Sequence, residues 1–345
     1  KEMHKQHFTY DPTLGGMTLG FMEGVFNDKE VLFHGGSTML YNTGLYLVPE
    51  VNTGIFISCS GGNHLLHSEV FQEFMDFYYP IQAQIKGVPG EGSLERAKKF
   101  TGEYQMNRKS VTTDEKIAGI LAGGIINVDV NEDGYLLVTN GGETNKFIEI
   151  EPGVYQNLRE GRTQDAFGPF HKIIFKTDSL HRIMLTSDGP MTYSKAPFYS
   201  TMSFTALAAI SIILIIISSL IYWIIMVISG WFKRGKNKSS RFSAFASWVG
   251  IGTSIAILIL FANLFSSGID PVYQLPREAY MPVEGNTLLN FIPTLILIFS
   301  CLLLPFTVIA WRKGYWGRIA RVHYSIFTLA VIGLMWMLNY WNLFV

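Results

Sequence analysis

Four long apolar stretches in the second half of the chain limit its fold more than any other feature. They cover roughly residues 202–232, 242–265, 288–311 and 322–343. Each reaches the roughly 20 residues that an α-helix needs to cross a bilayer core of about 30 Å. The spans contain no Asp, Glu, Lys or Arg, which favours a membrane anchor over an ion or proton transporter. The pattern predicts four transmembrane helices within residues 197–345, in contact with a lipid bilayer.

Charge is divided unevenly between the two halves of the chain. Residues 1–196 carry 17 Lys+Arg and 24 Asp+Glu, a net charge of −7, whereas residues 197–345 carry 10 and 3, a net charge of +7. Two connecting segments, 233–241 and 312–321, hold five and four basic residues without an acid. Because positively charged loops stay in the cytoplasm, we expect a multi-pass protein of the cell membrane whose soluble domains lie on the extracytoplasmic side.

The composition also excludes several classes of protein. Its 48% hydrophobic and 14% aromatic residues are incompatible with a disordered chain. The soluble half has no run of basic residues, so we expect no nucleic-acid partner. The two cysteines, Cys59 and Cys301, are too few for a disulfide scaffold.

Residues 99–196 have the pattern of a small all-β domain. Short strand-like runs occur at 125–130, 135–139, 146–150, 172–175 and 182–185. Turn sequences such as Asn140-Gly141-Gly142 and Glu151-Pro152-Gly153 separate them. This spacing predicts a barrel or a sandwich and does not decide between them. A glycine-rich stretch predicts a linker over residues 86–98.

Residues 1–85 contain the sequence that points to chemistry. We expect strands at 16–26, 30–33, 44–48 and 54–59 and a helix over 63–79. The tetrapeptide His34-Gly35-Gly36-Ser37 directly follows the second expected strand. An antiparallel sheet with one flanking helix is too small for a complete domain, so the pattern predicts an α+β fragment.

Several segments of residues 1–85 resemble the last part of the serine β-lactamase-related hydrolases. This family includes class C β-lactamases, penicillin-binding proteins, esterases and D-amino-acid peptidases. The resemblance is carried by Gly-Met-Thr-Leu-Gly-Phe at 16–21, His-Gly-Gly at 34–36, Leu-Tyr-Leu-Val-Pro-Glu at 45–50 and Asn-Thr-Gly-Ile-Phe-Ile at 52–57. The β domain and the membrane anchor that follow are similar to accessory parts of membrane-attached members.

The resemblance implies roles for four residues. The family uses Ser-x-x-Lys for the nucleophile and its base, then Tyr-x-Asn or Tyr-x-Ser, and then Lys-Thr-Gly or His-x-Gly beside the cleft. The third motif is present as His34-Gly35-Gly36, and no Ser-x-x-Lys occurs in the chain. Tyr155-Gln156-Asn157 has the spacing of the second motif but lies in the expected β domain. By resemblance, His34 contacts the substrate, Gly35 and Gly36 let its backbone lie close, and the backbone N–H of Ser37 serves the oxyanion hole. A Ser acyl-enzyme needs no metal or organic cofactor.

We therefore expect the C-terminal portion of a membrane-anchored, extracytoplasmic serine hydrolase, with a peptide, ester or β-lactam-like substrate. This chain alone is expected to be inactive, because the nucleophile motif is missing. The alternative is a non-catalytic membrane protein whose outer domains bind a ligand or partner, with His34 a surface histidine at a strand end. The sequence does not indicate an oligomeric state.

Overall fold

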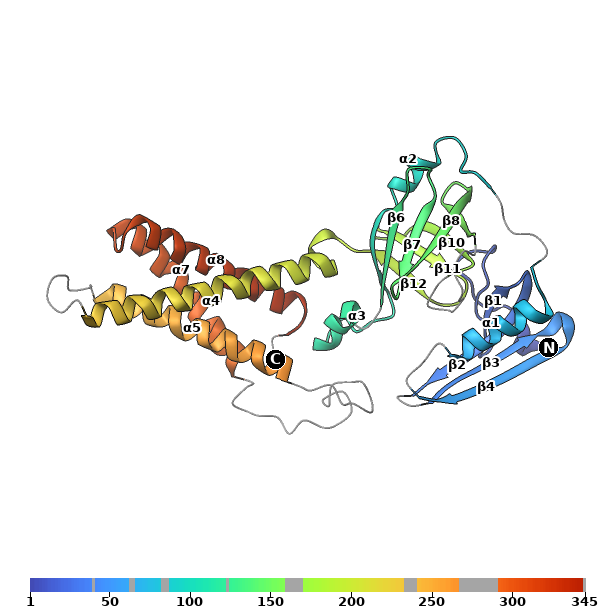
Figure 1. Cartoon of the computed structure of the whole chain (residues 1–345), viewed down its shortest axis with the longest axis horizontal. Helices are drawn as coiled ribbons and strands as arrows, with labels where there is room; N and C mark the ends of the chain where they lie inside the picture. Colours follow the sequence, from blue (N-terminus) through green and yellow to red (C-terminus); the bar gives the residue numbers. More distant parts are fainter. Residues whose placement is uncertain are drawn as a thin grey trace. The chain divides into compact units, whose positions relative to one another are not determined.

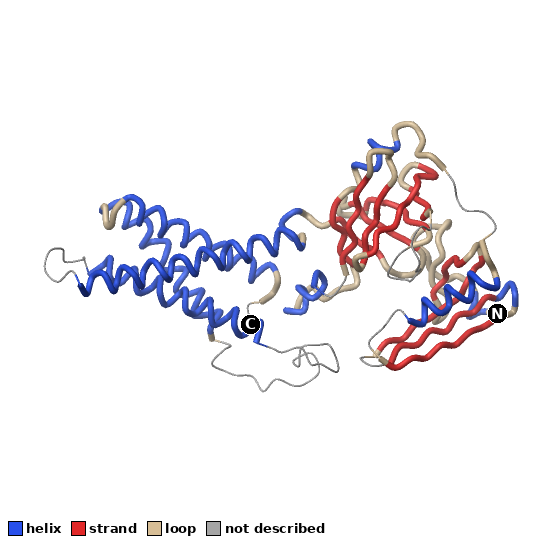
Figure 2. Tube along the Cα trace, in the orientation of Figure 1, coloured by secondary structure: helices blue, strands red, loops and turns tan. Residues whose placement is uncertain are grey.

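The computed structural model describes residues 1–38, 41–61, 66–81, 87–121, 124–158, 170–232, 241–266 and 291–343 (Figures 1 and 2). The chain divides into two compact units. The first comprises Lys1–Ser110 and Ala118–Thr201, and the second comprises Val111–Ile117 and Met202–Val345. The first unit is built mainly from strands and the second from long helices (Figure 2).

A four-stranded antiparallel sheet begins the first unit. Its strands are β1 (Met22–Phe26), β2 (Lys29–Ser37), β3 (Tyr41–Val48) and β4 (Thr53–Ser60), in that order across the sheet. Helix α1 (Leu66–Tyr78) covers one face (Figure 1). Between them Phe33 and Tyr46 of the sheet pack with Phe71 and Met75 of the helix, as the alternation of side chains along a strand requires.

Two of the expected strand boundaries in this sheet were wrong. Residues 16–21 were expected to be strand, but β1 begins only at Met22, after a turn in which Gly20 has a positive φ of 92°. The second strand was expected to end at Phe33, but β2 continues to Ser37. Glycine has no side chain, so Gly35 and Gly36 hide the period of two by which a strand is recognised.

The remainder of the first unit is a closed, eight-stranded antiparallel barrel. Its strands are β5 (Gly102–Met106), β6 (Ile125–Val130), β7 (Leu136–Asn140), β8 (Glu143–Glu151), β9 (Val154–Asn157), β10 (Lys172–Thr177), β11 (Ile183–Ser187) and β12 (Thr192–Lys195). Each strand pairs with the next along the chain, and β12 pairs with β5 to close the barrel. Tyr104, Phe147, Tyr155 and Tyr193 are buried in its core. The expected β domain is therefore a barrel, whose closure leaves no sheet edge exposed.

Part of the expected linker belongs to the barrel instead. Ser93–Lys98 forms the short helix α2, and its Ala97 is fully buried in the barrel core. The guanidinium of Arg96 makes an ion pair with the buried carboxylate of Glu149 on β8, with Nη2 and Oε2 2.7 Å apart. The six residues contain only two apolar side chains, Leu94 and Ala97, which are too few for a helical period to be recognised in the sequence.

The N-terminal residues are bound to the barrel strands. Lys176 of β10 forms an ion pair with Asp11, with Nζ and Oδ2 2.9 Å apart. The carboxylate of Asp188, in the turn between β11 and β12, accepts a hydrogen bond from the backbone N–H of Gly15 at 2.8 Å. Gly189 N–H donates to the carbonyl of Gly15 at 3.1 Å. These contacts join residues far apart in the sequence, which is why the sequence pattern did not show them.

The Asp188 contact predicts a pH-dependent stability. Burial raises the pKa of the Asp188 carboxyl to about 6, and Glu23 raises it further, whereas the Gly15 N–H and Lys172 oppose the shift. A carboxyl whose pKa is raised in the folded state destabilises the fold when ionised, so stability returns as the pH falls from about 6 towards 3.8. Below the folded-state pKa, the free energy of unfolding rises by about 1.4 kcal/mol for each pH unit of acidification. We therefore expect Asp188 to increase the stability of the fold by about 1.4 kcal/mol when the pH falls from 7.5 to 5.

Melting temperatures of the wild type and Asp188→Asn across this pH range measure the contribution. The asparagine keeps an oxygen for the Gly15 N–H but cannot ionise. The wild type is expected to gain stability relative to the variant on acidification, and parallel profiles for the two proteins would refute the assignment.

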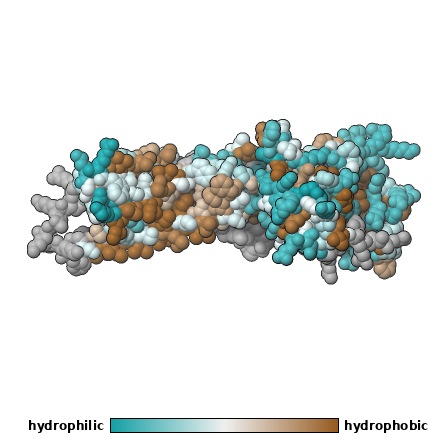
Figure 3. All heavy atoms as spheres, turned by 90° about the horizontal axis from the view of Figure 1, so that it is seen from above, coloured by the Kyte–Doolittle hydropathy of each residue, from teal (hydrophilic) through white to brown (hydrophobic). Residues whose placement is uncertain are grey.

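The second unit contains four long apolar helices. They are α4 (Met202–Phe232), α5 (Arg241–Ser266), α7 (Ile292–Lys313) and α8 (Arg318–Tyr340). All four are long and apolar enough to cross a membrane, which confirms the expected number of spans among the described residues. Ile216, Ile257, Leu303 and Phe327 form part of their common core. Large apolar side chains also cover much of the outer surface of the helices, seen in brown in Figure 3.

A surface of this kind is suited to lipid and indicates a membrane protein. The basic residues 233–240 and the connection 267–290 lie outside the described residues. The sidedness that they imply therefore stays a prediction.

Candidate functional site

The tetrapeptide His34-Gly35-Gly36-Ser37 forms the end of β2, beyond the end of its neighbour β1. The pairing of β1 with β2 stops at Met22 opposite Phe33. The pairing of β2 with β3 continues to Ser37 opposite Asn42. Within the described part of the chain, no strand pairs with the outer edge of β2 after Phe33. This backbone edge is therefore open.

The direction of the backbone groups at this edge follows from the pairing. The N–H of Thr38 donates to the carbonyl of Tyr41 at 2.8 Å, on the β3 side. In an antiparallel strand, successive residues direct their N–H and C=O groups to opposite edges. The N–H groups of Gly35 and Ser37 accordingly point away from β3. Two donors separated by one residue can hold an extended backbone or a developing oxyanion.

The side chains of the tetrapeptide divide between the two faces of the sheet. Phe33 faces α1, so His34 and Gly36 lie on the opposite face, where His34 is exposed. The Thr43 hydroxyl donates to the Gly36 carbonyl at 3.2 Å. The Ser37 hydroxyl donates to Oδ1 of Asn42 at 2.6 Å. Because of this bond, the Ser37 side chain is engaged within the sheet, and its backbone N–H remains the group of interest.

A buried tyrosine–histidine pair lies beneath the tetrapeptide, on the α1 face. The Tyr46 hydroxyl and Nδ1 of His67 are 2.7 Å apart, and both residues are buried. Gly44, directly opposite Gly35 in the ladder, provides the space for them. A Cβ at Gly44 would lie 2.5 Å from the Tyr46 ring and 2.7 Å from Nδ1 of His67. The pair therefore supports β2 and β3 at the motif.

Sequence reasoning did not find this support. His67 is not among the residues to which the sequence assigns a role. The available signal was the i, i+4 spacing of His67 and Phe71, which places His67 on the apolar face of the helix. The structure brings together the predicted residues His34, Gly35, Gly36 and Ser37 on one strand, but it does not test their roles.

Comparison with known proteins does not show a family. The chain matches no protein-family model and no curated protein. Among solved structures, a crystal structure of SurE with D-Leu aligns at 13% identity with a TM-score of 0.29, over 56% of this chain and 42% of that chain. The octameric penicillin-binding protein homologue from Pyrococcus abyssi aligns at 14% identity with a TM-score of 0.21, over 56% and 41%.

The chain thus spans about two fifths of the length of each of these proteins. At such TM-scores the likeness carries no argument about fold or function.

Proposed function

We propose that this chain is part of a membrane-anchored serine hydrolase of the β-lactamase-related type. Its substrate would be a small peptide, an ester or a β-lactam-like compound, attacked by a serine to form an acyl-enzyme. The observation that carries the proposal is the open edge of β2, where the N–H groups of Gly35 and Ser37 point outward beside an exposed His34. The His-Gly-Gly sequence at this edge agrees with the third motif of the family.

Each residue of the tetrapeptide has a proposed role in acyl transfer. Donors that are already in place stabilise the oxyanion that develops when a carbonyl is attacked, and the Ser37 N–H would be one of them. The Gly35 N–H would pair with the substrate backbone, as an added strand does. Gly36 leaves room for that close approach, and His34 would contact the polar end of the substrate. The nucleophile and its base would come from a Ser-x-x-Lys motif outside this sequence.

The location of the site is also part of the proposal. With the basic segments 233–241 and 312–321 in the cytoplasm, the soluble unit lies on the extracytoplasmic side. The four helices then serve as an anchor, because the predicted spans contain no acidic or basic residue that could move ions.

A second function is favoured by one feature of the sequence. No Ser-x-x-Lys occurs in the 345 residues, and an open strand edge can bind an extended partner segment by main-chain hydrogen bonds without any reaction. A non-catalytic membrane protein whose outer domains bind a ligand or a partner is therefore the rival proposal.

A serine-directed fluorophosphonate probe separates the two proposals. We expect no labelling of this chain alone, because it lacks the nucleophile motif. The natural protein that contains the upstream sequence is expected to be labelled on one serine, with its heat-denatured form as the control. Absence of labelling in both proteins would favour the binding protein. Fold-dependent labelling of the isolated chain would show that the catalytic serine is assigned to the wrong segment.

A further inference from the structure

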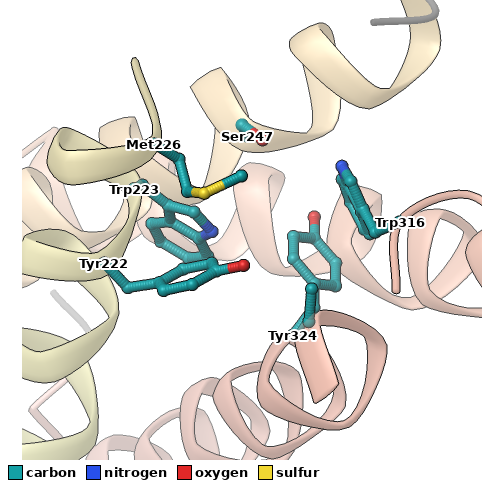
Figure 4. A pocket seen from close by; sticks show the side chains of 7 residues that line it. Tyr222, Trp223, Met226, Ser247, Trp316 and Tyr324 are labelled. Carbon is teal, nitrogen blue, oxygen red and sulfur yellow. The ribbon is translucent and has the colours of Figure 1, made fainter. Parts of the chain in front are cut away.

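A small cavity lies in the helical bundle, at the end where α7 connects to α8. Its volume is about 30 Å³. Helix α4 contributes Tyr222, Trp223 and Met226, and α5, the α7–α8 connection and α8 contribute Ser247, Trp316 and Tyr324 (Figure 4). Figure 4 shows the α4 side chains on one side of the space and Tyr324 with Trp316 on the other. No carboxylate is among the residues that line it.

The walls of this cavity are held by specific packing. The Trp223 ring lies directly against α5, where a Cβ on Gly250 would come within 2.5 Å of it. Trp316 has a φ of 62°, in the left-handed region that favours glycine, and its ring centroid is 5.1 Å from that of Tyr324. Strained backbone of this kind persists where the surrounding structure over-determines it, and it clusters at ligand sites.

Two hydroxyl groups of the cavity are suited to accept hydrogen bonds. The Ser247 hydroxyl donates to the carbonyl of Ser243 at 3.0 Å, and the Tyr324 hydroxyl donates to the carbonyl of Ala246 at 3.3 Å. Because their protons are engaged, both oxygens offer only lone pairs to a ligand. The aromatic rings add the negative potential of their faces, which attracts cations. An ammonium is positively charged and only donates, so it matches these two acceptors and the faces of the surrounding rings.

The volume of the cavity determines which kind of ammonium can fit into it. A cavity needs about 10–15 Å³ to hold one water molecule, so about 30 Å³ accommodates one small group. A primary ammonium, close to water in size, fits this space. A quaternary ammonium carries three further methyl groups and does not fit.

A basic side chain of α8 lies one helical turn from a residue of the cavity wall. Arg321 is one turn before Tyr324 on α8, and its guanidinium lies 4.9 Å from the Trp311 ring. Its Nε is buried without a hydrogen-bond acceptor in the described part of the chain. Arg318 is also on the first turn of α8. These cations would repel a free amine, whereas they favour a ligand that carries an anion next to its ammonium.

We propose that this cavity binds the head group of a phospholipid that carries a primary ammonium beside its phosphate. The ammonium occupies the space between Tyr222, Ser247 and Tyr324, and the phosphate accepts the N–H of Arg321. A free phosphoamine has the same chemistry without the acyl chains. The site is independent of the reaction proposed above for the soluble unit.

Native mass spectrometry of the delipidated full chain in detergent tests the proposal. Equal amounts of dioleoyl phosphatidylethanolamine, phosphatidylcholine and phosphatidylglycerol are added, with soluble O-phosphoethanolamine in a parallel sample. We expect one phosphatidylethanolamine to be retained about tenfold more strongly than the other two lipids, since a desolvated cation–π site of this kind is worth about one factor of ten. Competition by O-phosphoethanolamine at equal concentration would assign the site to the soluble compound. Equal retention of the three lipids, or a preference for phosphatidylglycerol, would overturn the proposal.

Four variants at the site and one control variant show where the lipid binds. Tyr222→Leu is expected to reduce the preference to less than about twofold, whereas Tyr222→Phe keeps the ring and most of the preference. Ser247→Ala, a smaller change that preserves the aromatic packing, should weaken it severalfold and covers the case in which Tyr222→Leu does not fold. Arg321→Gln should weaken the retention of all three lipids to a similar extent, because each carries a phosphate. Trp336→Leu is the control, because Trp336 stacks on Tyr340 near the other end of α8. Unchanged lipid preference in a folded Ser247→Ala and Tyr222→Leu would refute the site.

Discussion

Gly44→Val is expected to destabilise the soluble unit by about 3 kcal/mol, at the upper end of the usual cost of overpacking a core. The first added carbon would lie 2.5 Å from the Tyr46 ring and 2.7 Å from Nδ1 of His67. The Tyr46 ring cannot move aside, because it stacks on Phe71 with centroids 4.0 Å apart. For a unit of this size, the expected fall in melting temperature is about 6–12 °C.

Gly35→Ala is the matched control, because Gly35 is the cross-strand partner of Gly44. Its nearest neighbours would be the Thr43 carbonyl at 3.6 Å and the His67 ring at 3.7 Å, which are ordinary contacts. We expect a change in stability of less than about 1 kcal/mol. Similar melting temperatures for Gly44→Val and Gly35→Ala would contradict the packing described beneath the motif.

Gly36→Val is expected to abolish turnover of the full-length protein while the sheet remains folded. Gly36 lies on the face opposite α1, beside the open edge of β2. Among the described residues, a Cβ there meets only the Thr43 hydroxyl, at 3.2 Å. A branched side chain suits a strand, but it would occupy the space through which a substrate backbone approaches Gly35. Steady-state hydrolysis of an ester substrate, with the melting temperature as the control for folding, gives the result. Normal turnover by a folded Gly36→Val protein would contradict the proposed approach of the substrate along this edge.

The parts of the fold that depend on local sequence patterns could be predicted, whereas the parts that depend on contacts between distant residues could not. Hydropathy alone identified the four membrane helices, and turn sequences located most strands of the β domain. Whether those strands form a barrel or a sandwich depends on whether β12 pairs with β5, a contact between distant residues that no local pattern encodes. The same reason explains the missed contacts of Asp11 with Lys176 and of Gly15 with Asp188.

The candidate site was predicted from a motif, and its surroundings were not. His34 to Ser37 were identified by their resemblance to a family, yet their place inside β2 was hidden by the two glycines. The His67–Tyr46 bond needs α1 to fold back onto β3, and the aromatic cavity needs α4, α5 and α8 to meet. No local sequence pattern indicates either arrangement, because each depends on packing between segments that are far apart in the chain.

We propose that the open edge of β2 at His34–Ser37 contributes to acyl transfer. The most direct test of this proposal is the single-turnover acylation rate of the purified full-length protein in detergent, with His34→Ala and His34→Lys compared to the wild type. We expect His34→Ala to lower the rate by about 10²–10³, the effect of losing one oriented catalytic group. The melting temperature should change little, because His34 is exposed. His34→Lys should retain more activity, since lysine can also donate to the substrate. Acylation of His34→Ala at the wild-type rate, with an unchanged melting temperature, would show that the tetrapeptide is the end of a strand without a part in acyl transfer.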